Sequence, residues 1–379
     1  EPVGYDVEII TISAGILGLA TAYELSQKNR SVFVIEKHPS FCVETSSRNS
    51  EVVHAGLYYK PESLKSRYCV LGRDLLYNFC QIFNVPVKKC GKYVVAIHDH
   101  QEDELCKIKN NALQNNVKLD FIASSFLKTT PQLKHFKAAL WSEHSGIVDS
   151  HIFATTLIKL MQGTSTQIVY KTQFIELINK DKQFYTLLLK DEKHTYQLKC
   201  KNIFNAAGLS SAKIAKYFCK EKSYQIKPCR GRYFSLVNKY RNYFDRLIYP
   251  IPDPAGGLGI HITFDLQGHL KLGPDVDWDF SDSIEADDQR LYEFNKKDLE
   301  QKNKFLQAGK NLIPSLEYED IHAGYIGIRP KLFIDNQLYE DFFILKEQAD
   351  KLSSIHFLGI ESPGLTASLA LAKSFVNHI

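Results

Sequence analysis

Residues 5–36, YDVEIITISAGILGLATAYELSQKNRSVFVIE, decide the fold class of this chain. Residues 7–12 form a short, β-branched apolar run that is typical of a buried strand. Over 16–25 the apolar residues recur at helical spacing, and 31–35 is a second apolar run that ends before Glu36. The stretch therefore predicts a strand, a tight turn, a helix, a second strand and an acid at the carboxyl end of that strand.

A parallel βαβ unit of this kind binds the pyrophosphate of a dinucleotide through backbone amides at the start of its helix. Glu36 stands where an acid accepts hydrogen bonds from the adenosine ribose. Gly15 and Gly18 are present where the backbone approaches phosphate and where the helix packs on the strand. Ser13 replaces the glycine of the tight turn, so we expect a strained loop there. The alternative is a βα turn in a fold that binds no nucleotide.

The composition is that of an ordinary globular protein. Of 379 residues, 44% are hydrophobic and 24% are charged, and no apolar run reaches the roughly 18 residues of a membrane span. The net charge of +4 without a basic cluster argues against nucleic acid as a partner. The eight cysteines show no CxxC pair and no metal-ligand spacing, so we expect free thiols in a reducing compartment and no metal. Because residue 1 is Glu, we expect that a targeting segment was removed or that the chain was trimmed.

Helices and strands alternate in the first half of the chain. Residues 93–97 predict a strand and 102–114 a helix. A helix is expected to follow Pro61, and the residues predicted on its buried face are Leu64, Tyr68, Leu71, Leu75 and Phe79. A further helix, capped by Asp149 or Ser150, has a predicted apolar face of Ile152, Phe153, Leu157, Leu160 and Met161.

From Thr166 the pattern changes to β. A meander is predicted from strands at 167–170, 173–178, 184–189 and 196–199. It leads into 202–208, a strand that ends in the small residues Ala206, Ala207 and Gly208 and is followed by a helix over 210–218. This turn is either a second approach of the backbone to the same nucleotide or simply a tight βα turn.

The later part of the chain is rich in β-branched and aromatic residues. Strands are expected at 230–236, 247–251, 258–264 and 270–272, before a polar helical stretch over about 287–308. The chain closes with the run at 324–330, strands at 342–345 and 355–358, and a helix over 365–377. A small-residue loop feeds the start of that last helix, which makes an anion-stabilising pole.

We predict an α/β fold, α+β overall, with discontinuous domains. Residues 1–86, 146–220 and 322–379 are expected to form a Rossmann-like cofactor domain around a central parallel sheet. Residues 87–145 and 221–321 are expected to form a second, mainly antiparallel β-sheet domain that carries the substrate pocket.

Together these stretches resemble the FAD-dependent oxidoreductases of the D-amino-acid-oxidase-like superfamily, and within it the L-2-hydroxyglutarate dehydrogenase/oxidase branch. The resemblance covers nearly the whole chain in order. It is carried by Asn49-Ser50 with 53–65 (VHAGLYYKPESLK), CGK at 90–92, GIVD at 146–149, NAAG at 205–208, RGRY at 230–233, GIH at 259–261, LGP at 272–274, GIR at 327–329, Ser362-Pro363 and 366–368 (TAS). Ser13 and Glu51 depart from the pattern, which has glycine at the first position and a small residue at the second.

The resemblance implies FAD-dependent oxidation of an L-2-hydroxy acid, L-2-hydroxyglutarate or a close relative, to the 2-oxo acid. The electron acceptor stays open among oxygen, a quinone and a carrier protein. A mitochondrial location is expected, with a bacterial cytoplasm as the alternative. We expect no transmembrane segment, while peripheral membrane or complex association stays open.

Oxidation of a secondary alcohol needs a base for the hydroxyl proton, and His54 and His261 are the candidates among thirteen histidines. Arg329 and Arg232 are expected to clamp carboxylates in a forked geometry. Pocket-lining tyrosines are expected at Tyr58, Tyr59 and Tyr233. The alternatives are core histidines hydrogen-bonded to backbone, surface arginines and strand-edge tyrosines.

Non-covalent contacts with FAD are expected from Ser13, Gly15, Ile16, Gly18, Glu36, Lys37, Ser47, Asn49, Ser50, Phe174, Ala207, Gly208, Arg329, Gly364, Leu365 and Thr366. Ser47 and Asn49 are placed near the pyrophosphate or the ring, and Phe174 near adenine through its backbone. The amides of 364–366 are expected at the pyrimidine edge of the flavin, where negative charge builds up on reduction.

Two competing functions follow from the same fold. An amino-acid or secondary-amine oxidase is one, although an amine would favour an acidic or aromatic-cage pocket over a second arginine. A non-catalytic structural subunit of a larger assembly is the other, with Ser13 as an early sign of site decay. Intact His54, His261 and Arg329 argue against decay.

Overall fold

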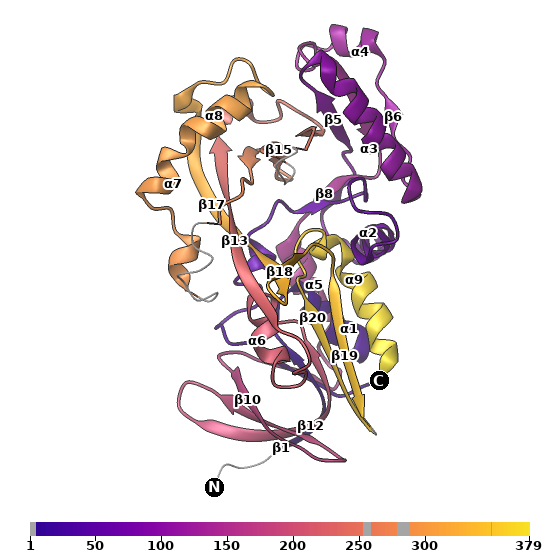
Figure 1. Ribbon diagram of the computed structural model, residues 1–379, viewed down its shortest axis with the longest axis vertical. Coiled ribbons are helices and arrows are strands. Elements are labelled where there is room, and N and C mark those ends of the chain that lie inside the picture. The colour runs from indigo at the N-terminus through magenta and orange to yellow at the C-terminus, as the bar shows by residue number, and fades with distance from the viewer. Residues whose placement is uncertain (1–4, 253–258, 279–287, 350) are drawn as a thin grey trace.

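The computed structural model describes residues 5–252, 259–278, 288–349 and 351–379 (Figure 1). The strands of these residues form an eight-stranded, a nine-stranded and a three-stranded sheet. Mixed α/β architecture with a parallel sheet and a second, mainly antiparallel sheet confirms the predicted fold class.

The eight-stranded sheet has a parallel core. Its parallel strands, in spatial order, are β20 (Leu352–Leu358), β12 (Thr195–Asn205), β1 (Tyr5–Ile12), β2 (Val32–Ile35) and β9 (Thr166–Val169). Three antiparallel strands extend it beyond the edge of β12 that does not pair with β1: β10 (Gln173–Lys180) and β11 (Tyr185–Lys190), of which β11 pairs with β12, and β19 (Phe343–Ala349), which pairs with β20. The predicted meander therefore consists of β10 to β12, and β9 leaves it to pair with β2. The expectation that residues 167–170 belong to the meander was wrong, because the residue pattern of a strand does not indicate which strand it pairs with.

Four helices pack beside this parallel core: α1 (Ile16–Ser26), α2 (Leu64–Phe83), α5 (Ser150–Met161) and α9 (Gly364–Phe375). Figure 1 shows α9 lying alongside α1 and α2. Two glycines allow these helices to approach neighbouring backbone closely. A Cβ added to Gly18 would lie 2.0 Å from the carbonyl oxygen of Ser13, and one added to Gly72 would lie 2.3 Å from that of Thr366. The helices thereby hold the ends of β1 and the start of α9 in fixed positions.

The nine-stranded sheet runs in the order β18-β17-β13-β16-β15-β14-β5-β7-β6. Its strands are β5 (Lys92–Ala96), β6 (Asp120–Phe121), β7 (Ala138–Ser142), β13 (Tyr224–Leu236), β14 (Leu247–Pro250), β15 (His261–Phe264), β16 (Leu270–Gly273), β17 (Ile321–Ile334) and β18 (Gln337–Tyr339). All neighbours are antiparallel except β14 and β5. Helix α3 (Glu102–Gln114) contacts β5 and β7 and lies with α4 (Ser124–Thr129) on the right in Figure 1, whereas α8 (Lys302–Lys310) contacts β16 and lies with α7 (Lys296–Glu300) on the left.

Two strands that the expected division assigned to the cofactor domain belong to the nine-stranded sheet. β17 pairs with β13 from Ile321 to Ile334 and β18 pairs with β17, although the expected boundary at 322 put them in the cofactor domain. A small sheet of β3 (Val52–Val53), β8 (Gly146–Val148) and β4 (Val87–Lys88) lies where the chain passes between the two larger sheets. We propose that the two domains meet along β13, β17 and this small sheet.

Some helix faces also differ from prediction. Leu71 is 48% exposed and Ile152 is 37% exposed, because each lies just beyond the edge of its helix's buried stripe. Ser63 rather than Pro61 begins α2, accepting a hydrogen bond from the amide of Ser66, and Asp149 caps α5 as expected.

Helices are also shorter than predicted in two places, the polar stretch near 287–308 and the segment 210–218. The first contains a 3-10 turn (Gln289–Tyr292) before α7 and α8, and the second a 3-10 turn (Gly208–Ser210) before α6 (Ser211–Ala215). Residue 287, and residue 258 of the strand expected over 258–264, lie outside the described residues.

A buried ion network holds the middle of the nine-stranded sheet to α7. Arg230 is fully buried and Arg232 nearly so, and their guanidinium groups donate to three aspartates. These are Asp275, Asp277 and Asp298, at donor-to-oxygen distances of 2.5–3.1 Å. Removal of one member of such a network leaves a buried charge without its partner.

Asp298→Ala should therefore lower the free energy of unfolding by about 3–5 kcal/mol. The exposed pair of Asp245 with Arg246 provides a control, because Asp245→Ala should cost less than about 1 kcal/mol. Burial favours the neutral acid, but hydrogen bonds from Arg230, Asn295 and Arg232 lower the pKa of Asp298. The stability from this group is thus present above the ordinary pKa of about 3.9 and is lost as the pH falls below it. Chemical denaturation measures both variants, and equal losses would contradict the prediction.

Candidate active site

The turn between β1 and α1 is strained at its first residue. Ser13 has φ of +95°, a left-handed conformation that a residue with a side chain rarely adopts, and its amide donates to the carbonyl of Ile35 at 2.8 Å. The expectation of a strained loop is confirmed. The strain follows from the tight turn that brings the start of α1 against the end of β1.

The first amides of α1 point to serine hydroxyls. The amide of Gly15 donates to Ser13 Oγ at 3.1 Å, and that of Ile16 donates to Ser46 Oγ at 3.0 Å. These amides are the donors that a pyrophosphate would use at the start of a helix. Ser46, rather than the predicted Ser47, therefore lies against the first amides of α1. Ser47 Oγ instead donates to the carbonyls of Val43 and Glu44.

Glu36 holds the turn from the end of β2. Its two carboxylate oxygens accept hydrogen bonds from the amides of Ala14 and His38, at 2.8 and 2.9 Å. A carboxylate has about four lone-pair positions, so acceptor capacity is left for a ribose hydroxyl. The acid thus both braces the loop and faces the cavity beside it.

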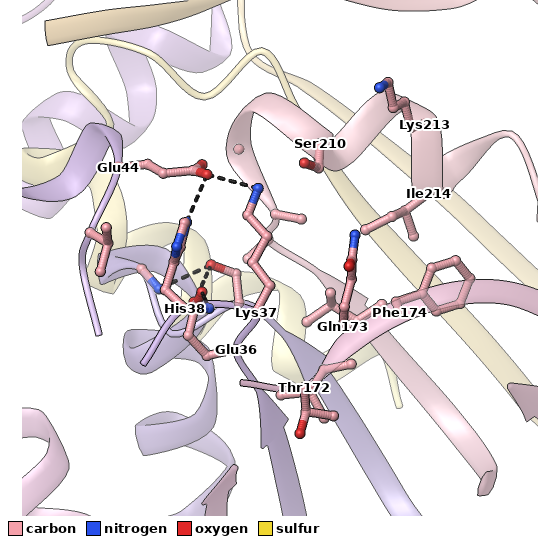
Figure 2. Close-up of a pocket in the computed structure, with 18 of the residues that line it drawn as sticks. Glu36, Lys37, His38, Glu44, Thr172, Gln173, Phe174, Ser210, Lys213 and Ile214 are labelled. Carbon is pink, nitrogen blue, oxygen red and sulfur yellow. Dashed lines mark hydrogen bonds and ion pairs between the residues drawn. The ribbon is translucent and has the colours of Figure 1, made fainter. Parts of the chain in front are cut away.

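A cavity of about 300 Å³ brings together segments that lie far apart in the sequence (Figure 2). Its lining includes Ser13 and Gly15, residues 35–38 and 42–46, residues 172–175, residues 206–208, and Ser210, Lys213, Ile214 and Tyr217. Phe174, Ala207 and Gly208, which the sequence linked to the same nucleotide, lie around it with Glu36. Its shape, its helix-terminal amides and its acid fit the adenosine and pyrophosphate part of a dinucleotide.

Figure 2 also shows an ion pair at the mouth of this cavity. Lys37 Nζ lies 2.8 Å from Glu44 Oε1, and His38 Nε2 lies 3.0 Å from the same oxygen. Burial favours the neutral acid, but the hydrogen bond from His38 and the charge of Lys37 lower the pKa of Glu44. Glu44 and His38 were missed by sequence reasoning, since they lie in a loop without a motif.

The loop after the pyrophosphate segment is held by its own side chains. Asn49 donates through Nδ2 to the carbonyls of Thr45 and Ser46 and accepts from the amide of Glu51. Glu51, one of the departures from the family pattern, accepts from the amide and hydroxyl of Ser150 at the start of α5. Glu51 therefore acts as a second cap of that helix, which explains an acid at this position.

His54 lies against the loop that begins α9. Its amide donates to Thr366 Oγ1 at 3.0 Å, and its Nε2 lies 3.1 Å from Ser362 Oγ. The predicted residues Gly364, Leu365 and Thr366 form the first turn of α9. Burial and the nearby Lys92 and His261 lower the pKa of His54, so its imidazole is neutral at neutral pH.

His261 is held in one tautomer on β15. Its Nδ1 lies 3.0 Å from the carbonyl oxygen of Gly259, which can only accept, so Nδ1 carries the proton. Nε2 then carries a lone pair, and it is buried without a hydrogen-bond partner among the described residues. Burial and the charge of Lys92 lower the pKa of His261 to about 3. The ring stacks on Tyr249 of β14 at a centroid distance of 3.9 Å.

Arg329 and Arg232 differ sharply in their partners. Arg329 donates to the carbonyls of Arg230 and Asp275 at 3.3 and 3.0 Å, and among the described residues no carboxylate pairs with it. Arg232 is enclosed by the aspartates of the ion network described above. Its donors are used within the protein, so the structure does not bring Arg232 to the site as a carboxylate clamp.

The predicted tyrosines lie around His54 and His261. Tyr233 hydrogen-bonds with Ser50 at 2.9 Å and stacks on Tyr325, whose hydroxyl donates to the carbonyl of Asn49. The hydroxyl of Tyr58 is buried without a hydrogen-bond partner among the described residues. Burial raises the pKa of Tyr59 well above its usual value.

Comparison with known proteins identifies this arrangement. A family model of FAD-dependent oxidoreductases matches residues 12–377. The chain belongs to the FAD-dependent oxidoreductase family. The helix-terminal amides, Glu36 and the cavity of Figure 2 fit FAD, the cofactor of this family.

The relatives agree with the branch that the sequence motifs indicated. The mitochondrial L-2-hydroxyglutarate dehydrogenase of Arabidopsis thaliana is 35% identical, with 98% of this chain and 83% of the relative covered. The L-2-hydroxyglutarate dehydrogenase of Indibacter alkaliphilus is 30% identical, with 97% of each chain covered.

Among solved structures, FAD-bound L-α-glycerophosphate oxidase from Mycoplasma pneumoniae has a TM-score of 0.84 and 25% identity, covering 98% of this chain and 94% of its own. Glycine oxidase from Geobacillus kaustophilus shares the fold, with a TM-score of 0.78 at 14% identity, covering 98% of this chain and 94% of its own. The described helices include none that is long and apolar enough to cross a bilayer.

Ser13→Gly should tighten FAD binding about fivefold, because the Gly15 amide then loses an internal acceptor worth about 1 kcal/mol and is left for the pyrophosphate. Quenching of FAD fluorescence on titration measures the affinity. Asn116→Gly is the control, since Asn116 also has positive φ (59°) but lies outside the cofactor cavity. An affinity for FAD that is unchanged in Ser13→Gly would show that the hydroxyl does not compete with phosphate.

Proposed function

We propose that this protein oxidises L-2-hydroxyglutarate, or a closely similar L-2-hydroxy dicarboxylic acid, to the 2-oxo acid. The observation that carries the proposal is the buried Nε2 of His261, which has no hydrogen-bond partner among the described residues and lies near cations that no described carboxylate neutralises. The names of the relatives from a plant and a bacterium support the same substrate.

The residues of the first turn of α1 would hold the cofactor's pyrophosphate, with Glu36 on the ribose and the backbone of Phe174 near adenine. The amides of 364–366 would face the pyrimidine edge of the ring. When bound, FAD supplies the acceptor for the hydride that leaves carbon 2 of the substrate.

His261 Nε2 is positioned to accept the substrate's hydroxyl proton. Its fixed tautomer presents a lone pair, and burial together with Lys92 keeps the imidazole unprotonated in the protein without substrate. A carboxylate bound nearby would offset the positive charge and raise the affinity of this nitrogen for a proton. His54, whose Nε2 is already within hydrogen-bond distance of Ser362, would orient the loop at α9.

Arg329 supplies the positive charge for one carboxylate of the substrate. It lies close enough to His261 to contribute to the lowered pKa of that residue. Its remaining donor capacity is not used by a carboxylate among the described residues, whereas that of Arg232 is. The cations argue against an amine substrate, because an ammonium group would be repelled.

We propose a mitochondrial location from the names of the plant and animal relatives, with a bacterial cytoplasm as the alternative given by the Indibacter relative. Oxygen, a quinone and a carrier protein stay equal candidates for the electron acceptor.

The proposal predicts that the flavin absorption band of the purified, FAD-loaded protein bleaches when L-2-hydroxyglutarate is added without oxygen. The reduction of the flavin is seen directly, so the electron acceptor does not have to be known. L-α-glycerophosphate and glycine are the comparison substrates. Bleaching by either of these and not by L-2-hydroxyglutarate would overturn the proposed substrate.

Arg329→Ala should raise the KM for L-2-hydroxyglutarate about 10- to 100-fold, the loss expected for a charge-assisted hydrogen bond, while FAD stays bound. Steady-state kinetics and the flavin spectrum measure the two effects. Arg241→Ala is the control, because Arg241 is exposed and donates only to a carbonyl at Gln267. An unchanged KM would remove Arg329 from the substrate site.

His261→Gln should slow anaerobic flavin reduction at saturating substrate by about 100-fold or more, because general-base catalysis contributes 10²–10⁴-fold. Stopped-flow absorbance measures the rate. The same measurement on His54→Gln compares the two candidate bases. A larger loss in His54→Gln than in His261→Gln would move the role of base to His54.

A further inference from the structure

Lys92 is a buried cation whose charge reaches His261, but the proposed function gives it no contact with the substrate. It begins β5, its side chain is fully buried, and its Nζ has no hydrogen-bond partner among the described residues. An unpaired ammonium in the interior is costly, so a protein rarely keeps one without a use. The position is therefore a candidate for ligand binding.

Aromatic rings lie near Lys92 and stabilise its positive charge only in part. Nζ lies 3.7 Å from the ring centroid of Tyr249 and 5.7 Å from that of Tyr58. These contacts are favourable cation–π interactions, but a ring face does not replace a hydrogen-bond acceptor for three N–H donors. An acceptor from outside the protein would complete the site.

Lys92 and His261 use the same aromatic ring. β14 lies between β15 and β5, so His261 and Lys92 approach Tyr249 from opposite sides. Three buried polar atoms without a partner are thus gathered here: Nζ of Lys92 and the hydroxyl of Tyr58 as donors, and Nε2 of His261 as an acceptor. A ligand that satisfies all three offers a hydroxyl proton together with carboxylate oxygens.

The two unneutralised cations flank His261. In the nine-stranded sheet, β15 lies between β17, which carries Arg329, and β5, which carries Lys92. Both charges lower the pKa of His261, so both reach it electrostatically. In a 2-hydroxy dicarboxylic acid the hydroxyl-bearing carbon likewise lies between two carboxylates.

We propose that Lys92 binds the second carboxylate of the substrate, opposite the one held by Arg329, and so selects dicarboxylic over monocarboxylic 2-hydroxy acids. This inference rests on the proposed function. It deepens that function by naming Lys92 as the residue that selects the substrate by its length and its second negative charge. Lys92 is a specificity-determining residue in this arrangement, and His261 remains the proton acceptor.

The charge of Lys92 changes within the neutral range, whereas its neighbours stay neutral. Burial lowers the pKa of Lys92 to about 7. Burial raises the pKa of Cys69 to about 12, and likewise raises the pKa of Cys90, Tyr58 and Tyr249. Burial and Lys92 keep the pKa of both His54 and His261 low.

Dicarboxylate binding should therefore weaken as the pH rises from 6 to 8.5, because Lys92 loses its proton.

The test uses the full FAD-loaded protein and two unreactive probes, glutarate and butyrate, whose binding is measured by calorimetry. Wild type should bind glutarate about 10- to 100-fold more tightly than butyrate, as expected for one added charge-assisted hydrogen bond. Lys92→Met, which keeps the length and packing of the side chain, should remove most of this ratio and leave butyrate binding unchanged.

Lys92→Arg should keep a preference for glutarate that no longer falls between pH 6 and 8.5. Lys88→Met is the control, since Lys88 is exposed and also lies over an aromatic ring.

A glutarate-to-butyrate ratio that is unchanged in Lys92→Met would overturn the proposal, and so would an equal loss for both probes, which indicates a packing role. Should Lys92→Met not fold, the wild-type pH profile decides: a flat glutarate affinity from pH 6 to 8.5 counts against Lys92. Failure of wild type to reduce flavin with any 2-hydroxy acid would overturn the proposed function. A Lys92-dependent preference for glutarate would in that case still support the binding site.

Discussion

The site depends on two positive charges, of which Lys92 is fully buried and Arg329 partly buried. Lys92 and Arg329 lie on either side of His261 in one sheet, and no carboxylate among the described residues neutralises them. Their fields and the low polarity of the site keep the imidazole of His261 unprotonated, which is the state that a base requires. The same fields favour an anionic substrate and disfavour an ammonium. Under the proposed function, one electrostatic constraint thus sets both the protonation state of the histidine and the class of ligand.

The network around Arg230 and Arg232 shows that buried cations paired with carboxylates serve the stability of the fold rather than ligand binding. Three aspartates accept every guanidinium contact described for Arg232, and the result is a brace between β13, β16 and α7. Arg230 and Arg232 on β13 thus brace the fold, whereas Arg329 on the neighbouring β17 donates to carbonyls and has no carboxylate partner among the described residues. Their partners rather than their type decide between structure and recognition.

The cofactor half of the molecule is linked to the substrate half by one continuous segment. The loop that supplies Ser46 to the amides of α1 continues through Asn49 and Glu51 to His54. Glu51 ties this segment to α5, and Thr366 ties it to α9. The helices that pack on the parallel sheet thereby set the position of the substrate site, so cofactor and substrate are placed by one scaffold.

Much of the cofactor half was predictable, because its signals are local. Apolar periodicity, a small-residue turn and an acid at the end of a strand indicate the unit around Glu36, and the small residues near Ala207 indicate the second approach to the same cavity. The tertiary structure alone decided which charges are paired. Arg232 contacts aspartates 43 to 66 residues further along the chain, while Lys92 contacts none in the part of the chain that the structure describes. No period or spacing in the sequence indicates such contacts. Strand partners and counter-ions depend on distances through space, and these exist only once the chain has folded.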